Sequence, residues 1–293
     1  MTFSFKTILR YKHSLFFALT AAVVACAGSG GSASSNPPVG ATAAPVSTAP
    51  TSDWWIPAPG SSFQYDLSDA GLPTPSASMV DLDWEATSAS NVAALHVAGS
   101  KAVCYVDAGT EETWRPDASS FPAVVIGNAD AGWPGEFWLD VRRYDILGPI
   151  MTARIATCKQ KGFDAVEFDN IDGYGNNTGF PLTLEDGENY LTKLAQVAHG
   201  DGLAVALKNA PEMLPAILPT VDFAIDEDCW QQGWCSSDAA LRTAKKLVVD
   251  VEYDDVTTLL QFDSIDCPAA AALGDTAILK HRTLDAWIAT CPS

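Results

Sequence analysis

Acidic and apolar side chains alternate in residues 162–172, which read GFDAVEFDNID. Asp164, Glu167, Asp169 and Asp172 bring four carboxylates into nine residues. Like charges repel, and a carboxylate that is buried without a partner carries a large free-energy penalty. Such a cluster at the end of an apolar strand indicates side chains that are gathered at the rim of a site for chemistry.

Polar residues also stand where other apolar segments of the chain end. They are Asp107, Lys208, Asn209, Glu227 and Glu252. The chain also contains nine tryptophans, whose flat rings can stack on the C–H faces of sugars. Paired carboxylates beside aromatic rings are typical of glycoside hydrolases, in which one acid protonates the leaving oxygen while the other attacks or activates water.

The sequence lacks the patterns that several other kinds of active site need. The four histidines form no H-E-x-x-H or H-x-x-x-H pattern, and there is no C-x-x-C, G-x-S-x-G or P-loop. We therefore expect no metal site and no cofactor.

Eight short apolar segments recur along the chain, and helical stretches separate them. Runs this apolar are typical of strands that are covered on both faces. The predicted strands are 61–68, 78–83, 101–109, 163–170, 202–210, 221–227, 246–253 and 276–282. Their alternation with helices predicts a parallel sheet closed into a (β/α)8 TIM barrel, an α/β fold whose strand ends converge on one face.

Helices are predicted at 144–162, 182–202 and 236–246. In the second of these, Thr183 and Asp186 have the spacing of a capping box, and serines start the third. Residues 110–145 break this rhythm as a long insertion that contains Trp114 and Trp133. Long loops of this kind are usually functional, so both rings are candidate sugar platforms, with packing inside the loop as the alternative.

The first 52 residues are predicted to lie outside the folded domain. Residues 1–25 combine a basic start with a short apolar stretch, which predicts an export signal. The stretch VVAC makes Cys26 a candidate for lipidation, as in bacterial lipoproteins, and an ordinary secretory signal is the alternative. Residues 26–52 are rich in Gly, Ser, Ala and Pro and predict a flexible tether. A single domain over 53–293 follows, and we expect it to be lipid-anchored to the cell envelope or otherwise secreted.

The chain is strongly acidic, with a formal net charge of −19. Such a field repels nucleic acid and attracts cations, although solubility alone also explains it. We expect a monomer with a cationic partner, no nucleic-acid partner, and membrane contact only through a lipid on Cys26.

Six cysteines follow Cys26, and an even number in an exported protein indicates disulfides. Cys229–Cys235 and Cys267–Cys291 are the favoured pairs because they are local, but six cysteines allow 15 connectivities.

Five segments together resemble glycoside hydrolase family 114, the endo-α-1,4-polygalactosaminidases. In chain order they are KAVCYVDAGTEETWRPD, GWPGEFWLDVR, GFDAVEFDNIDGYGNNTGF, LKNAPE and VDFAIDEDCW. The match covers essentially all of residues 53–293. The resemblance implies a (β/α)8 barrel that cleaves α-1,4-linked galactosamine polymers, which are cationic when deacetylated.

The resemblance also implies a catalytic pair. Asp169 in FDNID stands at the position of the first carboxylate of the family, and Glu227 in IDEDC at the position of the second. In a retaining enzyme Asp169 is the nucleophile and Glu227 the general acid/base, whereas inverting chemistry makes Asp169 a base. This chain has Phe168 where the family more often has Pro, and Asp226 where it commonly has Asn. We expect an extra carboxylate at 226 either to perturb Glu227 or to bind an ammonium group.

Eleven further residues are candidates for binding substrate. They are Asp83, Asp107, Glu111, Trp114, Arg115, Trp133, Asp172, Tyr174, Lys208, Asn209 and Glu252. Each has a structural alternative, such as neutralisation of Asp169 by Lys208. Three other functions stay open: an α-glycosidase of another specificity on the same barrel, a non-catalytic carbohydrate-binding lipoprotein, and a structural envelope lipoprotein.

Overall fold

The computed structural model describes residues 52–68 and 77–292. The predicted signal, Cys26 and all of the tether except Ser52 therefore lie outside the described residues.

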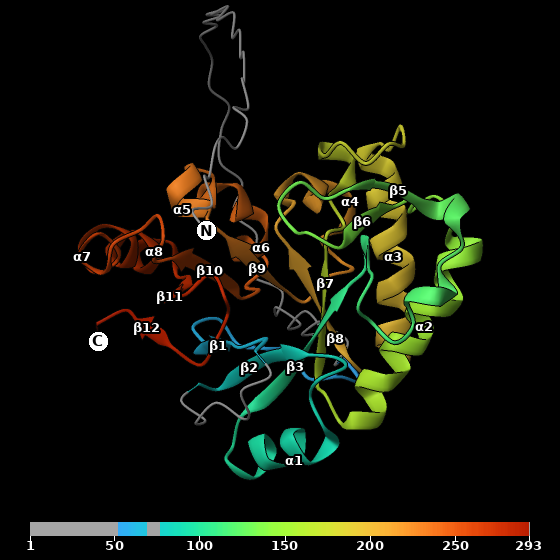
Figure 1. The fold of residues 1–293 in the computed structure, drawn as a ribbon. Coiled ribbons are helices and arrows are strands. Elements are labelled where there is room, and N and C mark those ends of the chain that lie inside the picture. The colour runs from blue at the N-terminus through green and yellow to red at the C-terminus, as the bar shows by residue number, and fades with distance from the viewer. Residues whose placement is uncertain (1–51, 69–76, 293) are drawn as a thin grey trace, which may run out of the picture. The chain divides into compact units, whose positions relative to one another are not determined.

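A nine-stranded sheet organises the chain (Figure 1), and its order is β1-β2-β3-β7-β8-β9-β10-β11-β12. The strands are β1 Phe63–Tyr65, β2 Met79–Asp83, β3 Lys101–Asp107, β7 Ala165–Asp169, β8 Ala204–Lys208, β9 Phe223–Glu227, β10 Val248–Tyr253, β11 Thr276–Lys280 and β12 Ile288–Thr290. Neighbours from β1 to β11 pair in parallel, and only β12 pairs antiparallel. The first eight strands of this order are the eight that the sequence predicts, which confirms the barrel.

Side chains join the two edges where the barrel closes. The Thr276 hydroxyl donates to the Ser61 carbonyl at 3.0 Å, and Lys280 Nζ donates to Gln64 Oε1 at 2.8 Å. Lys280 also donates to the carbonyl oxygens of Asp285 and Trp287, both at 2.6 Å. Strands β1 and β11 are thus linked across the seam by polar contacts.

The insertion after β3 contains a small sheet that the sequence did not predict. Strands β4 Thr110–Glu112, β5 Ile126–Ala129 and β6 Glu136–Leu139 pair antiparallel in the order β4-β6-β5. These strands have only three or four residues each, which is too short for an alternating pattern to be detected.

The helices cover the outer side of the sheet (Figure 1). They are α1 Ala89–Val97, α2 Tyr144–Lys161, α3 Leu184–Gly200, α4 Leu214–Ile217, α5 Cys229–Gln232, α6 Ala239–Thr243, α7 Leu259–Gln261 and α8 Cys267–Leu273. Helices α2 and α3 confirm two predictions, including the capping box of Thr183 and Asp186. The helix predicted at 236–246 is wrong in extent, because a 3-10 turn over Cys235–Asp238 precedes the short α6 and no serine side chain caps it. Among the described residues, no helix is both long and apolar enough to cross a bilayer.

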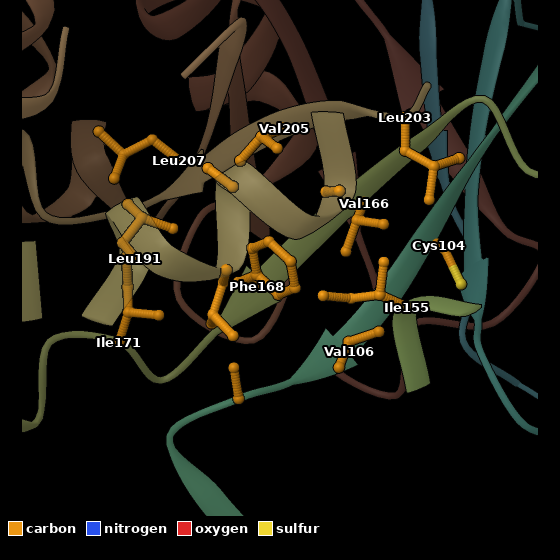
Figure 2. Packing of buried hydrophobic residues seen from close by; sticks show 14 of the residues in the cluster. Cys104, Val106, Ile155, Val166, Phe168, Ile171, Leu191, Leu203, Val205 and Leu207 are labelled. Carbon is orange, nitrogen blue, oxygen red and sulfur yellow. The ribbon is translucent and has the colours of Figure 1, made fainter. Parts of the chain in front are cut away.

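Strand alternation divides the buried residues into two layers. On β7, Val166 and Phe168 point outward and belong to the cluster that includes Ile155 of α2 and Leu191 of α3 (Figure 2). Ala165 of the same strand belongs instead to a separate cluster inside the barrel. The outward side chains therefore pack the helices against the sheet. The inward side chains fill the barrel below the polar strand ends.

Three disulfides connect elements of the barrel. Both predicted local pairs, Cys229–Cys235 and Cys267–Cys291, are formed. The third, Cys104–Cys158, ties β3 to α2 across a sequence separation of 54.

Two acids are buried together between the sheet and α6. Asp226 of β9 and Asp238 beside α6 are fully buried, and neither carboxyl has a hydrogen-bond partner other than its neighbour. Burial, reinforced by Asp238, raises the pKa of Asp226 well above its usual value, and burial raises the pKa of Asp238 to about 6. The pair is therefore stable when it shares a proton. The folded chain binds that proton more tightly than the unfolded chain, so stability falls as pH rises above about 4.

Replacement Asp226→Asn should stabilise the protein at neutral pH, because an amide can donate to Asp238 without a bound proton. We expect a gain of about 1–2 kcal/mol at pH 7.5 and almost none at pH 4.5. Chemical denaturation at both pH values measures this. Asp53→Asn, on an exposed carboxylate, is the control. An equal effect of Asp226→Asn at both pH values would exclude the shared proton.

Candidate active site

Four neighbouring strands end in side chains that meet on one face of the barrel. Asp169 ends β7, Lys208 ends β8, Glu227 ends β9 and Tyr253 ends β10. Lys208 Nζ lies 3.2 Å from Asp169 Oδ1 and 3.0 Å from Glu227 Oε2. One lysine therefore bridges the two carboxylates that the sequence singles out.

Lys208 is itself almost completely buried. Its Nζ also lies 3.3 Å from Glu167 Oε1, which is fully buried on β7. Burial opposes the positive charge, but Asp169, Glu227 and Glu167 outweigh it and raise the pKa of Lys208 well above its usual value. The lysine is thus a permanent cation beneath two carboxylates that are themselves 18% and 23% exposed.

Hydrogen bonds hold the carboxylate of Asp169 in place. Tyr105 of β3 donates its hydroxyl to Oδ2 at 2.7 Å, and the backbone N–H of Asn170 donates to Oδ1 at 2.8 Å. The end of β3 approaches this turn so closely that a Cβ on Gly109 would lie 1.7 Å from the Asn170 carbonyl oxygen. Only glycine fits there, and the close approach brings Asp107 within reach of the Asn170 amide at 2.9 Å.

Glu227 is held from two sides. The Tyr253 hydroxyl donates to its Oε1, and its backbone N–H donates to Asn209 Oδ1 at 2.9 Å. Asn209 adopts a left-handed backbone with φ of 49°, which asparagine tolerates better than most residues. The Arg282 guanidinium stacks over the Tyr253 ring at 3.9 Å and also pairs with Asp228. The backbone of Glu227 and one of its carboxyl oxygens are therefore held in place, while the carboxyl group as a whole stays partly exposed to solvent.

Further carboxyls of the same face have raised pKa values. Burial, with help from Asp169, raises the pKa of Asp172 to about 6. Burial also raises the pKa of Asp107 to about 7 and that of Glu136 to about 9, and neighbouring acids add to both. Asp107, Glu136 and Asp172 form an acidic wall, and part of it is neutral at pH 7 because of these raised pKa values.

Several residues that the sequence predicts to bind substrate instead contact other side chains of the protein. Arg115 donates two hydrogen bonds of 2.8 and 2.6 Å to Asp83, and it also donates to Glu112. Asp107 accepts hydrogen bonds from Thr110 and from Asn170. These side chains are buried, so the structure gives them the role of ordering the loop after β3.

The remaining predicted residues lie in three places. Trp114 and Trp133 are exposed on the insertion, at 58% and 53% of their surface, and Glu111 is buried in β4. Tyr174 is half-buried and donates its hydroxyl to Glu212 at 2.6 Å. Glu252 faces the helix side of β10, where it accepts the backbone N–H groups of Trp230 and Gln231 at the start of α5. The structure therefore keeps Glu252 away from the cluster around Lys208.

Asp226 is also outside this cluster, contrary to the expectation that it acts on Glu227 or on an ammonium group. Its side chain is fully buried beside Asp238. Successive residues of a strand point to opposite faces, so Asp226 faces outward when Glu227 faces the site.

Sequence reasoning missed three tyrosines that contact the cluster: Tyr65, Tyr105 and Tyr253. It was wrong to expect Glu167 and Asp164 at the rim, because Glu167 is buried inside the barrel and Asp164 pairs with Lys101 before β7 begins. Counting back in steps of two from Asp169 finds Glu167, and the same parity on β10 selects Tyr253 in preference to Glu252. No local signal shows which of these side chains touch, because they come from four different strands.

Two sets of described residues have the spacing of a metal site. Oxygens of Asp107, Glu112 and Glu136 lie within 4.8 Å of one another. Arg115 already neutralises Glu112, and hydroxyl and amide donors occupy Asp107. These partners account for the cluster without an ion. The second set, Cys229 and Cys235 with Glu252, has its sulfurs joined in a disulfide.

Replacement Lys208→Met should strongly destabilise the fold, because it leaves three carboxylates together without a cation. We expect a loss of about 3–5 kcal/mol at pH 7 and a smaller loss at pH 4.5, where protonation relieves the repulsion. Urea unfolding at the two pH values measures it. Lys101→Met is the matched control, because Lys101 is 42% exposed and its pair with Asp164 should be worth less than about 1 kcal/mol. Equal losses in the two variants would contradict the central role of Lys208.

Comparison with known proteins identifies the family of this chain. Comparison with curated proteins gives no match. Among solved structures, Aspergillus fumigatus Ega3 in complex with galactosamine is similar with a TM-score of 0.73 and 31% identity, over 81% of this chain and 97% of that one. The glycoside hydrolase domain of PelA from Pseudomonas aeruginosa has a TM-score of 0.60 at 15% identity, over 79% of this chain and 98% of that one, and shows the same fold. The profile of glycoside-hydrolase family GH114 matches residues 43–293, so the chain is a glycoside hydrolase and belongs to that family.

Proposed function

We propose that this protein is an exported, endo-acting glycoside hydrolase that cleaves α-1,4-linked galactosamine-containing polysaccharide. The observation that carries the proposal is the pair of partly exposed carboxylates, Asp169 and Glu227, held on one buried lysine at the strand ends. Hydrolysis of a glycosidic bond needs two carboxyl groups on either side of the bond. The complex of Ega3 with galactosamine supports an amino-sugar substrate.

Asp169 acts as the nucleophile and Glu227 as the general acid/base. The ion pair with Lys208 supplies a counter-charge to the Asp169 carboxylate, which attacks the anomeric carbon as an anion. Tyr105 and Tyr253 orient the two carboxyl groups. Both carboxylates have an oxygen within 3.2 Å of the same Nζ, so these oxygens are no more than about 6 Å apart. The separation of the two carboxyl groups as a whole decides the stereochemistry: it is about 5–5.5 Å in retaining enzymes and about 6.5–9.5 Å in inverting ones.

The acidic wall binds the cationic polymer. Asp172 lies beside Asp169 and adds a negative charge when it is ionised, and Glu136 lies near Asp107 in the same wall. An ammonium group that enters this region replaces a proton as the counter-charge, which favours deacetylated galactosamine over neutral sugars. Trp114 and Trp133, exposed on the insertion, serve as platforms for sugar units farther along the chain.

The N-terminal segment places the enzyme outside the cytoplasm. The export signal of residues 1–25 and the tether that follows support secretion, and lipidation of Cys26 anchors the folded domain at the cell envelope. The catalytic domain, residues 53–293, acts as a monomer.

Release of reducing ends from deacetylated α-1,4-galactosaminan tests the reaction and the pair. Asp169→Asn and Glu227→Gln should each lower kcat by at least about 10³-fold, because the two groups act in one displacement. Glu185→Gln, on an exposed residue in the first turn of α3, is the control and should keep full activity. Circular dichroism checks the fold of all variants. Full activity in either Asp169→Asn or Glu227→Gln would mean that another carboxyl of the rim does the chemistry.

The dependence on salt tests the charge of the substrate. The acidic surface should attract the deacetylated polymer, so kcat/KM should fall about tenfold between low and physiological ionic strength. An N-acetylated polymer carries no charge and should show almost no dependence on salt. Equal salt dependence of both polymers would exclude electrostatic selection of the substrate.

A further inference from the structure

A second pair of acids lies inside the barrel, below the site. Asp81 of β2 and Glu167 of β7 are both completely buried. Neither oxygen of Asp81 has a partner except Glu167, and Glu167 Oε2 has none except Asp81. The other oxygen of Glu167 accepts the Tyr65 hydroxyl at 3.2 Å and lies 3.3 Å from Lys208 Nζ. Both acids are shielded from the solvent-exposed face, so neither has a part in the proposed displacement.

The proton of this pair resides on Asp81. Two carboxyl groups in contact inside an apolar barrel cannot both be ionised without a large cost. Burial, reinforced by the charge of Glu167, raises the pKa of Asp81 well above its usual value. Burial also raises the pKa of Glu167, but Lys208 and the hydrogen bond with Asp81 act in the opposite direction. Asp81 is therefore the neutral donor, and Glu167 carries the negative charge next to the lysine.

We propose that Glu167 is a positioning residue whose buried charge, 3.3 Å from Lys208 Nζ, offsets that of the lysine and so limits the positive field that Lys208 exerts on Asp169 and Glu227. This inference rests on the proposed function. Without Glu167, the full positive charge of Lys208 would act on the two carboxylates at the surface. The stronger positive field would make Asp169 a weaker nucleophile and would alter proton transfer between Glu227 and the leaving group.

Other charged and titratable groups around Glu227 do not supply this balance. Tyr253 donates a hydrogen bond to Glu227, and Tyr65 of β1 lies 3.4 Å from Lys208 as a neutral hydroxyl. Arg282 adds positive charge above Tyr253 but is paired with Asp228 and Asp255. Asp169 also places a negative charge next to Lys208, but this charge is lost when the carboxylate forms a covalent bond to the sugar. Glu167 is the one neighbour of Lys208 described here that stays anionic through the reaction.

The pH profile of kcat/KM on deacetylated galactosaminan tests the proposal in the full chain. In Glu167→Gln the alkaline limb should move to lower pH by about one to two units, because loss of a negative charge next to Lys208 strengthens the positive field at the two carboxylates. Asp81→Asn is the matched control: its amide donates to Glu167 as the neutral acid does, so the alkaline limb should stay where it is in the wild type. An unchanged limb in Glu167→Gln would overturn the proposal. A similar shift in Asp81→Asn would place the charge on Asp81 and overturn it too.

A measurement of stability tests the same pair without activity. The double variant Glu167→Gln/Lys208→Met removes a positive and a negative charge together, so it should melt at a higher temperature than Lys208→Met alone at pH 7. An equal or lower melting temperature would mean that Glu167 is not the counter-charge. If the wild type releases no reducing ends, the proposed function fails, and the melting comparison still decides whether Glu167 balances Lys208.

Discussion

The ion pairs of one buried lysine organise this barrel. Lys208 Nζ lies within 3.3 Å of three carboxylates that come from β7 and β9, the two strands on either side of its own strand β8. A buried ammonium group is tolerated only when such partners surround it, and the partners in turn cannot lie together without the cation. The attraction therefore fixes the ends of β7, β8 and β9 relative to one another. The site and the stability of the barrel depend on the same contact.

Strand alternation explains how so many acids can be held in one chain of this size. On β7 and β9 the residues with odd numbers face the interior and end in Asp169 and Glu227, while those with even numbers face the helices. The carboxyl groups on the two faces of the sheet are stabilised in different ways. Inside, Lys208 and three tyrosine hydroxyls satisfy the carboxylates, whereas on the helix side Asp226 is accommodated by sharing a proton with Asp238. Carboxyl groups such as these, which are neutral when buried and charged when unfolding exposes them, make the stability of the protein depend on pH.

The long insertion extends the site beyond the strand ends. Its small antiparallel sheet is held to the barrel by Arg115, which connects Glu112 of β4 with Asp83 at the end of β2. Arg154 of α2 grips Asp117 of the insertion through two further hydrogen bonds. These ion pairs hold the loop in a fixed position, as the proposed role of its exposed Trp114 and Trp133 as sugar platforms requires.

The sequence by itself determined the eight barrel strands, the helices α2 and α3, the two local disulfides and the family. These features depend on local patterns, such as runs of apolar residues, a capping box and short motifs in a set order, which survive in one dimension. Only the tertiary structure decided that Lys208 bridges Asp169 and Glu227, that Glu252 faces α5, and that Glu167 lies over Asp81. These contacts join residues from different strands, and they depend on the register of each strand and on the closure of the barrel. A change of one residue in register would turn every side chain of a strand to its other face, so no local pattern could have predicted them.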